Sequence, residues 1–393
     1  MNIPKLRFKE FTDEWKHYSL DDIISISSKK YNPLTSNINY PCIELESILS
    51  NSGTIINTFD SLNQKSIKNV FKENDILFGK LRPYLKKYWY AKFNGVCSSE
   101  IWVLNNKLGL NKYLYYLIQT NKFNLIANNS TGSKMPRADW QFIKSQKFYI
   151  SNMLEQEKIA NFLTTVDKKI TNLENTITNL ENQKKGLLQQ IFSQKLRFKD
   201  ENGNNYPNWE KKKLGDISDV RDGTHDSPKY INSGYPLITS KNIQNGKISF
   251  DNINYISKED YDNINKRSKV SVGDIIMGMI GTIGNVALLS EENFAIKNVA
   301  LFKEKTLLKN IFLIQYLQSD TFYKSINNLN EGGTQKFISL KNIRNIYIKL
   351  PCLEEQTKIA DFLSAFDRKL ENQKAQLEHW QQIKKGLLQQ MFV

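Results

Sequence analysis

A nine-residue phrase occurs twice in this sequence, and the repeat constrains the fold more than any other feature. KKGLLQQIF occupies 184–192 and KKGLLQQMF occupies 384–392. Aligning 153–192 with 353–392 needs no gap and gives 18 identities in 40 positions. The identities gather at the two ends of the alignment, whereas 173–183 matches nothing in the second copy. Such internal similarity indicates a chain built from repeated structural units.

The rest of the chain repeats more weakly, and the repeat extends to the whole sequence. The matched segments are KLRFK at 5–9 and 195–199, DILFGKLRPYL at 75–85 and DIIMGMIGTIG at 274–284, and TGSKMPRADW at 131–140 and GGTQKFISLK at 332–341. We therefore predict globular domains at 1–150 and 195–350, each followed by a helical segment, at 151–194 and 351–393. Short apolar strands that run into glycine turns give these domains an α/β character, so the predicted fold class is α+β.

Apolar residues in both helical segments recur in steps of three and four, which is the pattern of a coiled-coil seam. Lys184 interrupts the first seam, and Gln373 and Lys384 interrupt the second. The first seam consists of Ile159, Leu163, Val166, Ile170, Leu173, Ile177, Leu180, Leu187 and Ile191. The second consists of Ile359, Leu363, Phe366, Leu370, Leu377, Trp380, Leu387 and Met391.

A one-sided helix of this length needs a partner. Forty residues make a helix of about 60 Å, and its apolar stripe is stable only against another apolar surface. We predict that the two helices pack on each other antiparallel and separate the two domains, which an internal pseudo-twofold axis then relates. KKGLLQQ of each copy would meet EQEKIANFL (155–163) or EQTKIADFL (355–363) of the other. The alternatives are two unrelated amphipathic helices or a parallel zipper between two chains.

The repeated phrase carries a glycine, Gly186 in the first copy and Gly386 in the second. A glycine inside a helix costs about 1 kcal/mol relative to alanine. Close approach of the two helices, or contact with another protein, could offset this cost. Fraying near a helix end is the simpler alternative.

The net positive charge of the chain lies in the two globular segments. The chain holds 55 Lys and Arg against 40 Asp and Glu. The excess is +9 in 1–150, zero in 151–194, +6 in 195–350 and zero in 351–393. Two basic blocks that alternate with two neutral ones indicate two surfaces for a polyanion and two segments with another task. A merely solubilising surface charge is the alternative.

Several classes of protein are disfavoured by what the sequence lacks. Its cysteines form no CxxC pair, and its histidines form no HxxxH or HExxH arrangement. We therefore expect neither a zinc site nor a disulfide framework. Reduced cysteines fit a protein of the cytoplasm, which is the location we expect. We see no apolar run long enough to cross a membrane. Phosphate loops, nucleophile elbows and dinucleotide fingerprints are also missing. We therefore expect no catalytic residue and no metal ligand in this chain.

Loops that mix cations with aromatic or small polar residues are the candidates for nucleic-acid contact. Cations neutralise phosphates, and arginine can also bind a guanine edge with two hydrogen bonds. The segments are GKLRPYLKKYWYAKF (79–93), GSKMPR (132–137) and RDGTHDSPKY (221–230). Counting further loop positions near the repeats, the candidates are Lys80, Arg82, Tyr84, Lys86, Lys87, Lys134, Arg137, Arg221, Thr224, His225, Lys241, Asn242, Gln335, Lys336 and Lys341.

The repeat, the paired basic blocks and the phrases EQxKIAxFL and KKGLLQQ together resemble the specificity subunits of type I restriction-modification systems. This resemblance covers Lys5 to Phe392. DGTHDSPKY, GYPLITSKNI (234–243) and GDIIMGMIGTIG (273–284) resemble the opening of one common class of target-recognition domain. The first half has SSKKYNPLT at the corresponding place, so we expect the two domains to recognise different sequences.

The resemblance implies a non-catalytic subunit in which each target-recognition domain contacts one half of a bipartite DNA site. Two methyltransferase subunits would dock on the helices, and translocating endonuclease subunits would join them. S-adenosylmethionine, ATP and Mg²⁺ would then be bound by the partners and not by this chain. The residues expected at the helix and subunit interface are Ile159, Leu163, Val166, Ile170, Gly186, Leu187, Ile191, Ile359, Leu363, Phe366, Leu370, Gly386, Leu387 and Met391.

Two other functions remain open from the sequence alone. The chain could be the recognition part of a self-contained modification enzyme, although the methyltransferase motifs are missing. It could also be a basic coiled-coil scaffold. Methyl transfer by the purified chain would favour the first, and absence of DNA binding at low salt would favour the second.

Overall fold

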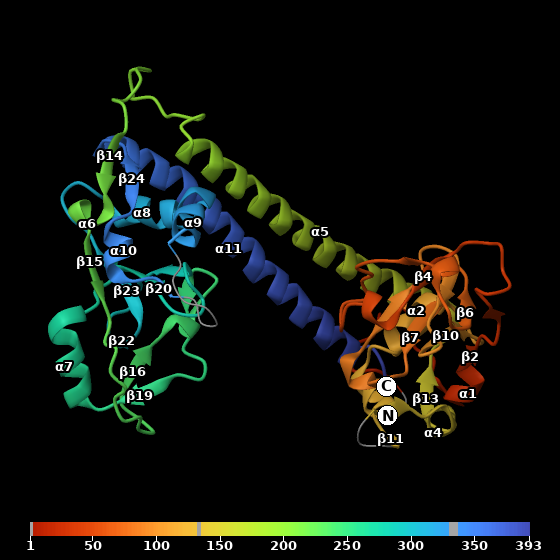
Figure 1. Ribbon diagram of the computed structural model, residues 1–393. Helices are drawn as coiled ribbons and strands as arrows, with labels where there is room; N and C mark the ends of the chain where they lie inside the picture. Colours follow the sequence, from red (N-terminus) through yellow and green to blue (C-terminus); the bar gives the residue numbers. More distant parts are fainter. Residues whose placement is uncertain (1–2, 132–134, 330–336) are drawn as a thin grey trace. The chain divides into compact units, whose positions relative to one another are not determined.

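The chain divides into two compact units in the computed structural model (Figure 1). The first unit comprises Met1–Glu174 with Ala375–Val393, and the second comprises Asn175–Lys374. Each long helix is therefore shared by the two units, because the division falls near the middle of the helix. The structure describes residues 3–131, 135–329 and 337–393.

Two β-sheets form the body of the first unit. An antiparallel four-stranded sheet has the order β2-β10-β7-β8, with bounds β2 (Ile24–Ile26), β10 (Ile101–Asn106), β7 (Ile76–Gly79) and β8 (Tyr88–Tyr90). A five-stranded sheet has the order β3-β6-β9-β4-β5, with bounds β3 (Lys30–Tyr31), β6 (Lys68–Phe71), β9 (Gly95–Cys97), β4 (Pro41–Ile43) and β5 (Phe59–Asp60). In this second sheet β4 and β9 run parallel.

The described globular part of the first unit also contains two short strand pairs and four short α-helices. Ser19, Thr120 and Asp139 each cap a helix by accepting a hydrogen bond from a backbone N–H of its first turn. The pairs are β1 (Lys16–Ser19) with β13 (Lys147–Ile150) and β11 (Ser130–Thr131) with β12 (Arg137–Ala138). The helices are α1 (Leu20–Ile23), α2 (Asn111–Leu117), α3 (Asn121–Ala127) and α4 (Trp140–Lys144).

The second unit is built around an antiparallel sheet of the same kind. Its order is β15-β23-β20-β21, with bounds β15 (Asp219–Asp222), β23 (Val299–Lys303), β20 (Ile275–Gly278) and β21 (Val286–Leu288). A three-stranded sheet has the order β19-β16-β22, with bounds β19 (Asn254–Ile256), β16 (Tyr235–Ile238) and β22 (Ala295–Ile296). The strand pairs are β14 (Glu210–Lys213) with β24 (Tyr347–Leu350) and β17 (Ile243–Gln244) with β18 (Lys247–Ile248).

The helices of the second unit follow the order of the first, with one addition. Helix α7 follows β19, whereas only a 3-10 helix, Ser61–Asn63, follows the equivalent strand β5 of the first unit; β3 and β6 have no counterpart in the described part of the second. The helices are α6 (Leu214–Ile217), α7 (Lys258–Ser268), α8 (Asn310–Leu317), α9 (Asp320–Asn327) and α10 (Leu340–Arg344). The weak sequence repeat is therefore a structural repeat, and the α+β prediction is confirmed.

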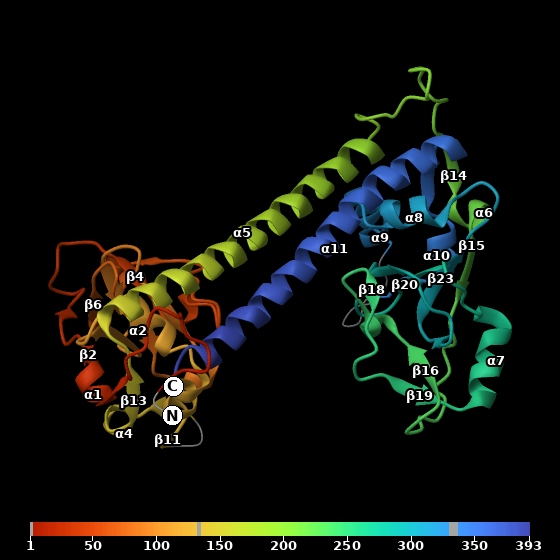
Figure 2. The same cartoon turned by 180° about the vertical axis from the view of Figure 1, so that it is seen from behind.

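The two long helices are α5 (Met153–Phe192) and α11 (Leu353–Gln390). Within each unit, segments of these helices run side by side (Figures 1 and 2). In the second unit Glu181 pairs with Lys374 and Lys184 with Asp367. Partner numbers on α11 fall as numbers on α5 rise, so the segments are antiparallel there.

The ends of the helices belong to the cores of the globular parts. In the first unit Ile159 and Leu163 lie in one apolar cluster with Leu388 and Met391. The equivalent cluster of the second unit joins Leu188, Ile191, Ile359, Ala360 and Leu363. Each KKGLLQQ phrase therefore meets the other copy's EQxKIAxFL phrase, as the sequence predicts. Identity at the ends is explained by two junctions of the same build.

Burial along the helices follows the predicted seams with local differences. Ile170, Leu187, Phe366 and Leu387 are half-buried, whereas the neighbouring Leu188 is buried. The fully buried members of the predicted interface are Ile159, Leu163, Val166, Ile191, Ile359, Leu363, Leu370 and Met391. No side chain or distant backbone among the described residues would lie within 4 Å of a Cβ added at Gly186. Close helix approach is therefore not what requires this glycine.

The lysines that interrupt the seams are ion-paired. Lys184 is buried, and its Nζ lies 2.5 Å from Oδ1 of Asp367 and 2.9 Å from Oε1 of Gln318. At the equivalent place in the first unit, Nζ of Lys384 lies 2.8 Å from Oδ1 of Asp167. A charge in a mostly apolar seam needs its partner nearby, so these two pairs favour one register of the helices.

A buried carboxylate fixes the start of each long helix. Glu155 accepts two hydrogen bonds from the Arg7 guanidinium, at 2.7 and 2.8 Å, and one from Nε1 of Trp15 at 3.0 Å. Glu355 is held in the same way by Arg197, at 2.7 and 2.8 Å, and by Nε1 of Trp209 at 2.8 Å. The repeated segment KLRFK therefore supplies the arginine at each helix start, and Trp15 and Trp209 supply equivalent indole donors.

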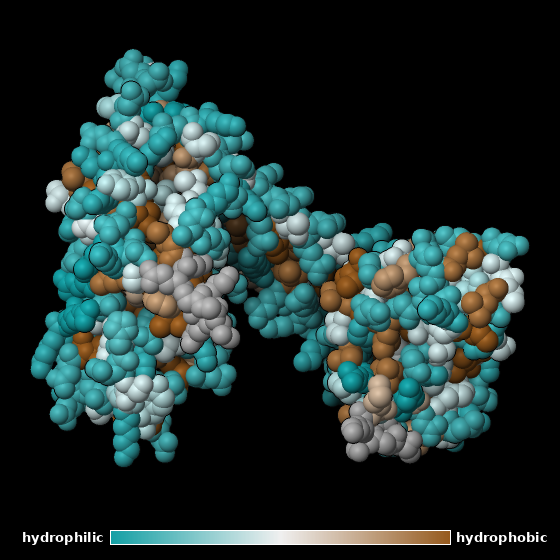
Figure 3. Space-filling view, viewed as in Figure 1, coloured by the Kyte–Doolittle hydropathy of each residue, from teal (hydrophilic) through white to brown (hydrophobic). Residues whose placement is uncertain are grey.

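The described residues contain neither a membrane-spanning helix nor a metal-binding cluster. No helix in this part of the chain is both long and apolar enough to cross a membrane. The same residues contain no group of three or more His, Cys, Asp or Glu side chains that could hold a metal ion. In Figure 3, hydrophilic residues cover most of the visible face of the second unit.

Candidate nucleic-acid interface

Two of the predicted loops of the first unit meet at the end of strand β7. The turn 80–87 joins β7 to β8, and residues 136–138 lie against it. Leu81 forms a β-bridge with Arg137. The Arg82 amide donates to the Pro136 carbonyl at 2.8 Å, and the Ala138 amide donates to the Lys80 carbonyl at 2.8 Å. Segments more than fifty residues apart in sequence therefore form one edge, called the first edge below.

A 3-10 helix, Leu45–Ser47, supports the first edge from beneath. Nζ of Lys87 donates to the Leu45 carbonyl at 2.7 Å. Burial lowers the pKa of this ammonium below its ordinary value. Lys87 therefore holds the turn in place, and its contact with DNA stays a prediction.

The other candidates of the first edge differ in exposure. Arg82 and Tyr84 are exposed, and Lys80 and Lys86 are half-buried. Nε of Arg137 lies 3.0 Å from Oε2 of Glu100, and its Nη2 donates to Oε1 at 3.3 Å. The Arg137 side chain is half-exposed, so this pair can contact a ligand. Because an exposed ion pair contributes only about 0–1 kcal/mol, it can also open for one.

The second unit has an equivalent edge, called the second edge. Here the turn 279–285 follows β20, as the glycine-rich sequence predicts. Ile280 forms a β-bridge with Phe337, and the Ile338 amide donates to the Met279 carbonyl at 3.0 Å. Thr282 Oγ1 donates to the Ser240 carbonyl at 2.9 Å. The loops around 224, 240, 281 and 338 therefore converge.

His225 lies at the centre of the second edge. Its Nδ1 is 2.8 Å from Oδ1 of Asn298 and its Nε2 is 3.0 Å from Oδ2 of Asp222. Arg267 forms an ion pair with the same aspartate. A hollow of about 210 Å³ opens beside these groups, lined by Asp222, His225, Met279, Ile280, Asn298, Phe337, Ile338, Ser339 and Leu340.

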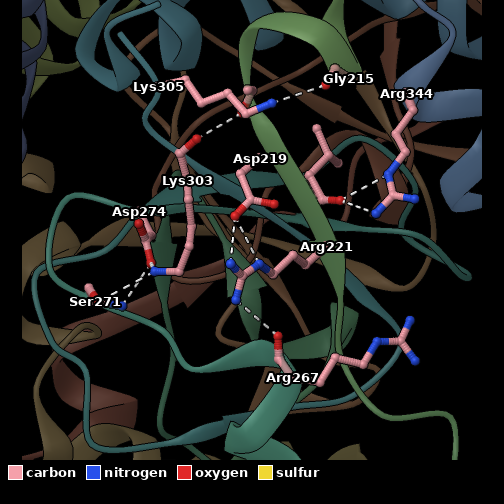
Figure 4. Close-up of polar contacts among 11 residues, drawn as sticks. Gly215, Asp219, Arg221, Arg267, Ser271, Asp274, Lys303, Lys305 and Arg344 are labelled. Carbon is pink, nitrogen blue, oxygen red and sulfur yellow. Dashed lines mark hydrogen bonds and ion pairs between the residues drawn. The ribbon is translucent and has the colours of Figure 1, made fainter.

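Several cations of the second unit have partners within the unit (Figure 4). Arg221 donates to Oδ2 of Asp219 at 2.6 and 3.0 Å and to the Arg267 carbonyl at 3.2 Å. The hydrogen bonds from Arg221 hold the pKa of Asp219 below its usual range. Lys303 pairs with Asp274, and Arg344 donates to the Val220 carbonyl. These contacts hold neighbouring strands of the sheet together, and the Lys303–Asp274 pair lies at the end of β20 opposite to the second edge.

The remaining predicted residues have different environments. Asn242 is buried, and its amide oxygen accepts hydrogen bonds from the Thr239 amide at 3.0 Å and hydroxyl at 2.9 Å. Its side chain therefore shapes the loop. Thr224 Oγ1 accepts from the Asp226 amide at 3.1 Å. Lys241 and Lys341 are exposed. Lys134, Gln335 and Lys336 lie outside the described residues.

Three polar residues of the two edges, Glu100, Asp222 and Asn298, are absent from the candidates predicted from the sequence. Glu100 and Asn298 follow equivalent loops, and Asp222 ends a strand. The composition of the loops favours their cations and gives no signal for these three residues. A carboxylate accepts hydrogen bonds from base edges, and an amide can both donate and accept them. Such groups can therefore form part of a base-contacting surface, as arginine does. No catalytic arrangement appears among these described residues.

Comparison with known proteins identifies the family. The family described as "Type I restriction modification DNA specificity domain" matches residues 12–182 and 206–379. The MjaVIII specificity subunit of a type I restriction enzyme from Methanocaldococcus jannaschii is 26% identical, over 85% of this chain and 81% of its own. The EcoBI specificity subunit from Escherichia coli is 30% identical, over 33% of this chain and 28% of its own.

Solved structures share the fold. The crystal structure of a type I restriction-modification S subunit from M. genitalium has a TM-score of 0.60 at 19% identity, with coverage of 100% of this chain and 99% of that one. A chain from a structure concerned with assembly of the type I R-M system has a TM-score of 0.58 at 17% identity, with coverage of 95% and 96%. The family match spans most of the sequence, in two copies that follow the two structural repeats. This chain therefore belongs to the type I restriction-modification DNA specificity family, the non-catalytic DNA-recognition component of these systems.

Proposed function

We propose that this chain recognises a bipartite, asymmetric DNA site, with one half-site contacted by each unit. The two long helices set the distance between the half-sites and dock two methyltransferase subunits that methylate adenine N6. Endonuclease and translocase subunits join this core. S-adenosylmethionine, ATP and Mg²⁺ bind to the partner subunits, and this chain binds none of them.

One observation carries the proposal: the two units present edges of the same build. Leu81 and Ile280 occupy equivalent positions, because each follows a central strand and bridges to Arg137 or Phe337. A duplicated edge within one chain provides two contact surfaces for one duplex. Half-sites about one helical turn apart, 34–36 Å, would place two major-groove faces on one side of the DNA.

The chemistry of the two edges supports different half-sites. At equivalent positions the first edge carries Arg137 and Glu100, whereas the second carries Phe337 and Asn298. Arginine favours guanine and a carboxylate favours the amino group of cytosine. An amide favours adenine, and an aromatic ring favours the methyl group of thymine. Two edges with such different side chains would select different base pairs.

Sequencing of methylated sites tests this proposal. Cells that express the chain with its methyltransferase partner should acquire a split motif of two different half-sites, separated by a fixed number of unspecified base pairs. A catalytically inactive methyltransferase provides the control. A short contiguous motif would contradict the bipartite reading, and failure of the assembled complex to bind DNA even at low salt would favour the scaffold alternative.

The glycines of the repeated phrase support docking of the partner on the helices. Gly186 and Gly386 occur at equivalent places on α5 and α11, and each costs its helix about 1 kcal/mol. Among the described residues, no atom within 4 Å explains Gly186, and only the flexible end of Gln390 reaches 4.0 Å from a Cβ at Gly386. Close contact with another protein would explain both.

Substitution of these glycines should separate folding from assembly. Gly186→Leu is expected to leave the helix intact and to weaken methyltransferase binding at least tenfold, because the added side chain fills the space that the partner needs. Gly186→Ala, the matched control, gains about 1 kcal/mol of helix stability with a smaller effect on assembly. Calorimetric titration with the partner measures both. Unchanged affinity of Gly186→Leu would remove this support for docking.

A further inference from the structure

The β7–β8 turn of the first unit is equivalent to the β20–β21 turn of the second. Residues with a left-handed backbone occupy equivalent positions in the two turns. The Gly79 amide donates to the Lys87 carbonyl at 2.8 Å, and the Gly278 amide donates to the Asn285 carbonyl at 2.9 Å. Counting from these hydrogen bonds and from the Leu81 and Ile280 bridges, Arg82 corresponds to Gly281 and Lys86 to Gly284.

Both pairs have left-handed backbone conformations. The φ angles are 51° at Arg82 and 50° at Lys86, against 75° at Gly281 and 83° at Gly284. A residue with a Cβ pays about 1–2 kcal/mol for this conformation, whereas glycine does not. The first unit thus places two long cationic side chains where its own repeat uses glycine.

The other left-handed residues show that this placement is unusual. Among the described residues, eight non-glycine residues have positive φ, and five of them are asparagine, which tolerates the conformation best. Arg82, Lys86 and Gln194 are the exceptions. Strained backbone of this kind persists where the surrounding structure enforces it, and it clusters at ligand-binding sites.

The surroundings of Arg82 direct its side chain outward. Pro83 is buried and starts a one-turn 3-10 helix, Pro83–Leu85, of which Arg82 and Lys86 are the two flanking residues. Arg82 is exposed, and its guanidinium makes no hydrogen bond or ion pair with another described residue. At the equivalent Gly281, an added Cβ would meet no atom of the described residues within 4 Å. The position is therefore open to a ligand.

We propose that Arg82 reads a guanine in the half-site of the first unit and that Lys86 binds a neighbouring phosphate. The guanidinium can donate two hydrogen bonds to O6 and N7 of guanine, and the ammonium acts as a point charge. The inference rests on the proposed function, since it assigns the first edge to one half-site. The second unit, with glycine at both positions, reads its half-site through other groups.

Glycine substitution gives a sharp test, because it should help folding and harm recognition. Arg82→Gly is expected to raise the Tm of the first unit by about 2–8 °C and to weaken binding of the assembled methyltransferase complex to its own site about 5- to 150-fold. Lys86→Gly should weaken binding to all sequences alike and lower the slope of log affinity against log salt by about one. Arg82→Lys should keep the salt slope and weaken the base preference, because an ammonium lacks the planar two-point geometry of the guanidinium.

Asn74→Gly is the matched control, because Asn74 is also left-handed, with φ 71°, but lies at the other end of β7. It should leave affinity unchanged. Sequencing of methylated sites with Arg82→Gly should show a relaxed base at one position of one half-site only. If the wild-type motif is split and Arg82→Gly leaves both the motif and the affinity unchanged, this inference fails while the proposed function stands. A contiguous wild-type motif would instead overturn the proposed function.

Discussion

Replacing Arg197 by alanine is expected to lower the free energy of unfolding of the second unit by about 3–5 kcal/mol, because it leaves a buried charge without its partner. The Glu355 side chain is 0% exposed, and without Arg197 its only remaining side-chain donor in the described structure is Trp209. The carboxylate also fixes the first turn of α11 to the globular part. The same substitution at Arg7 should weaken the first unit, where the Glu155 side chain is 1% exposed.

Local hydrogen exchange measures these effects unit by unit, which is necessary because a chain with two units need not unfold in one step. Lys158→Ala is the control. Its pair with Glu10 is 52% exposed on both sides, so its loss should cost less than about 1 kcal/mol. A second variant, Arg197→Met with Glu355→Gln, removes both charges and should recover much of the stability. Equal small effects of Arg197→Ala and Lys158→Ala would show that the carboxylate does not anchor the helix.

Lengthening both long helices by one turn is expected to change the spacing of the recognised site and to leave its half-sites unchanged. Four residues would be inserted within 173–183 and four within 373–383, where the two copies diverge and where the division between units falls. Both junctions of the repeated phrases then keep their contacts. Four helical residues add about 6 Å, which corresponds to one or two base pairs at about 3.4 Å each.

Sequencing of methylated sites again provides the measurement. Insertion of two residues in each helix is the control, since about 100° of rotation per residue turns the apolar seam away from its partner; this variant should lose helix pairing and DNA binding. A four-residue variant with altered half-sites would contradict the view that the helices act only as a spacer.

The sequence predicted most of the framework, because periodicity and repetition are local properties of a chain. The seams of α5 and α11, the glycine turn after β20 and the meeting of KKGLLQQ with EQxKIAxFL all follow from spacing. From the sequence alone, Lys184 and Lys384 are only polar interruptions of the apolar seams. The structure instead gives each an aspartate partner on the facing helix segment of the same unit.

The candidate interface was predicted less completely. The loops selected from the sequence converge at the two edges, and their contact with DNA stays a prediction. Composition favoured most of the cations within them. Lys87 and Arg221 have partners inside the fold, and Asn242 is buried. Glu100, Asp222 and Asn298, which bind the selected Arg137 and His225, carry no local signal. Their role depends on which strand lies beside which, and sequence spacing does not encode this.

By itself the sequence determined a duplicated α+β chain with two paired helices and two basic domains, since a gapless repeat and a heptad pattern admit few other arrangements. Only the tertiary structure decided which side chains of each edge are free for a ligand. Strand pairing brings the turn after β7 against residues 136–138, and the turn after β20 against residues 337–338. It thereby aligns Arg82 with Gly281 and reveals a strained arginine where the repeat has a glycine.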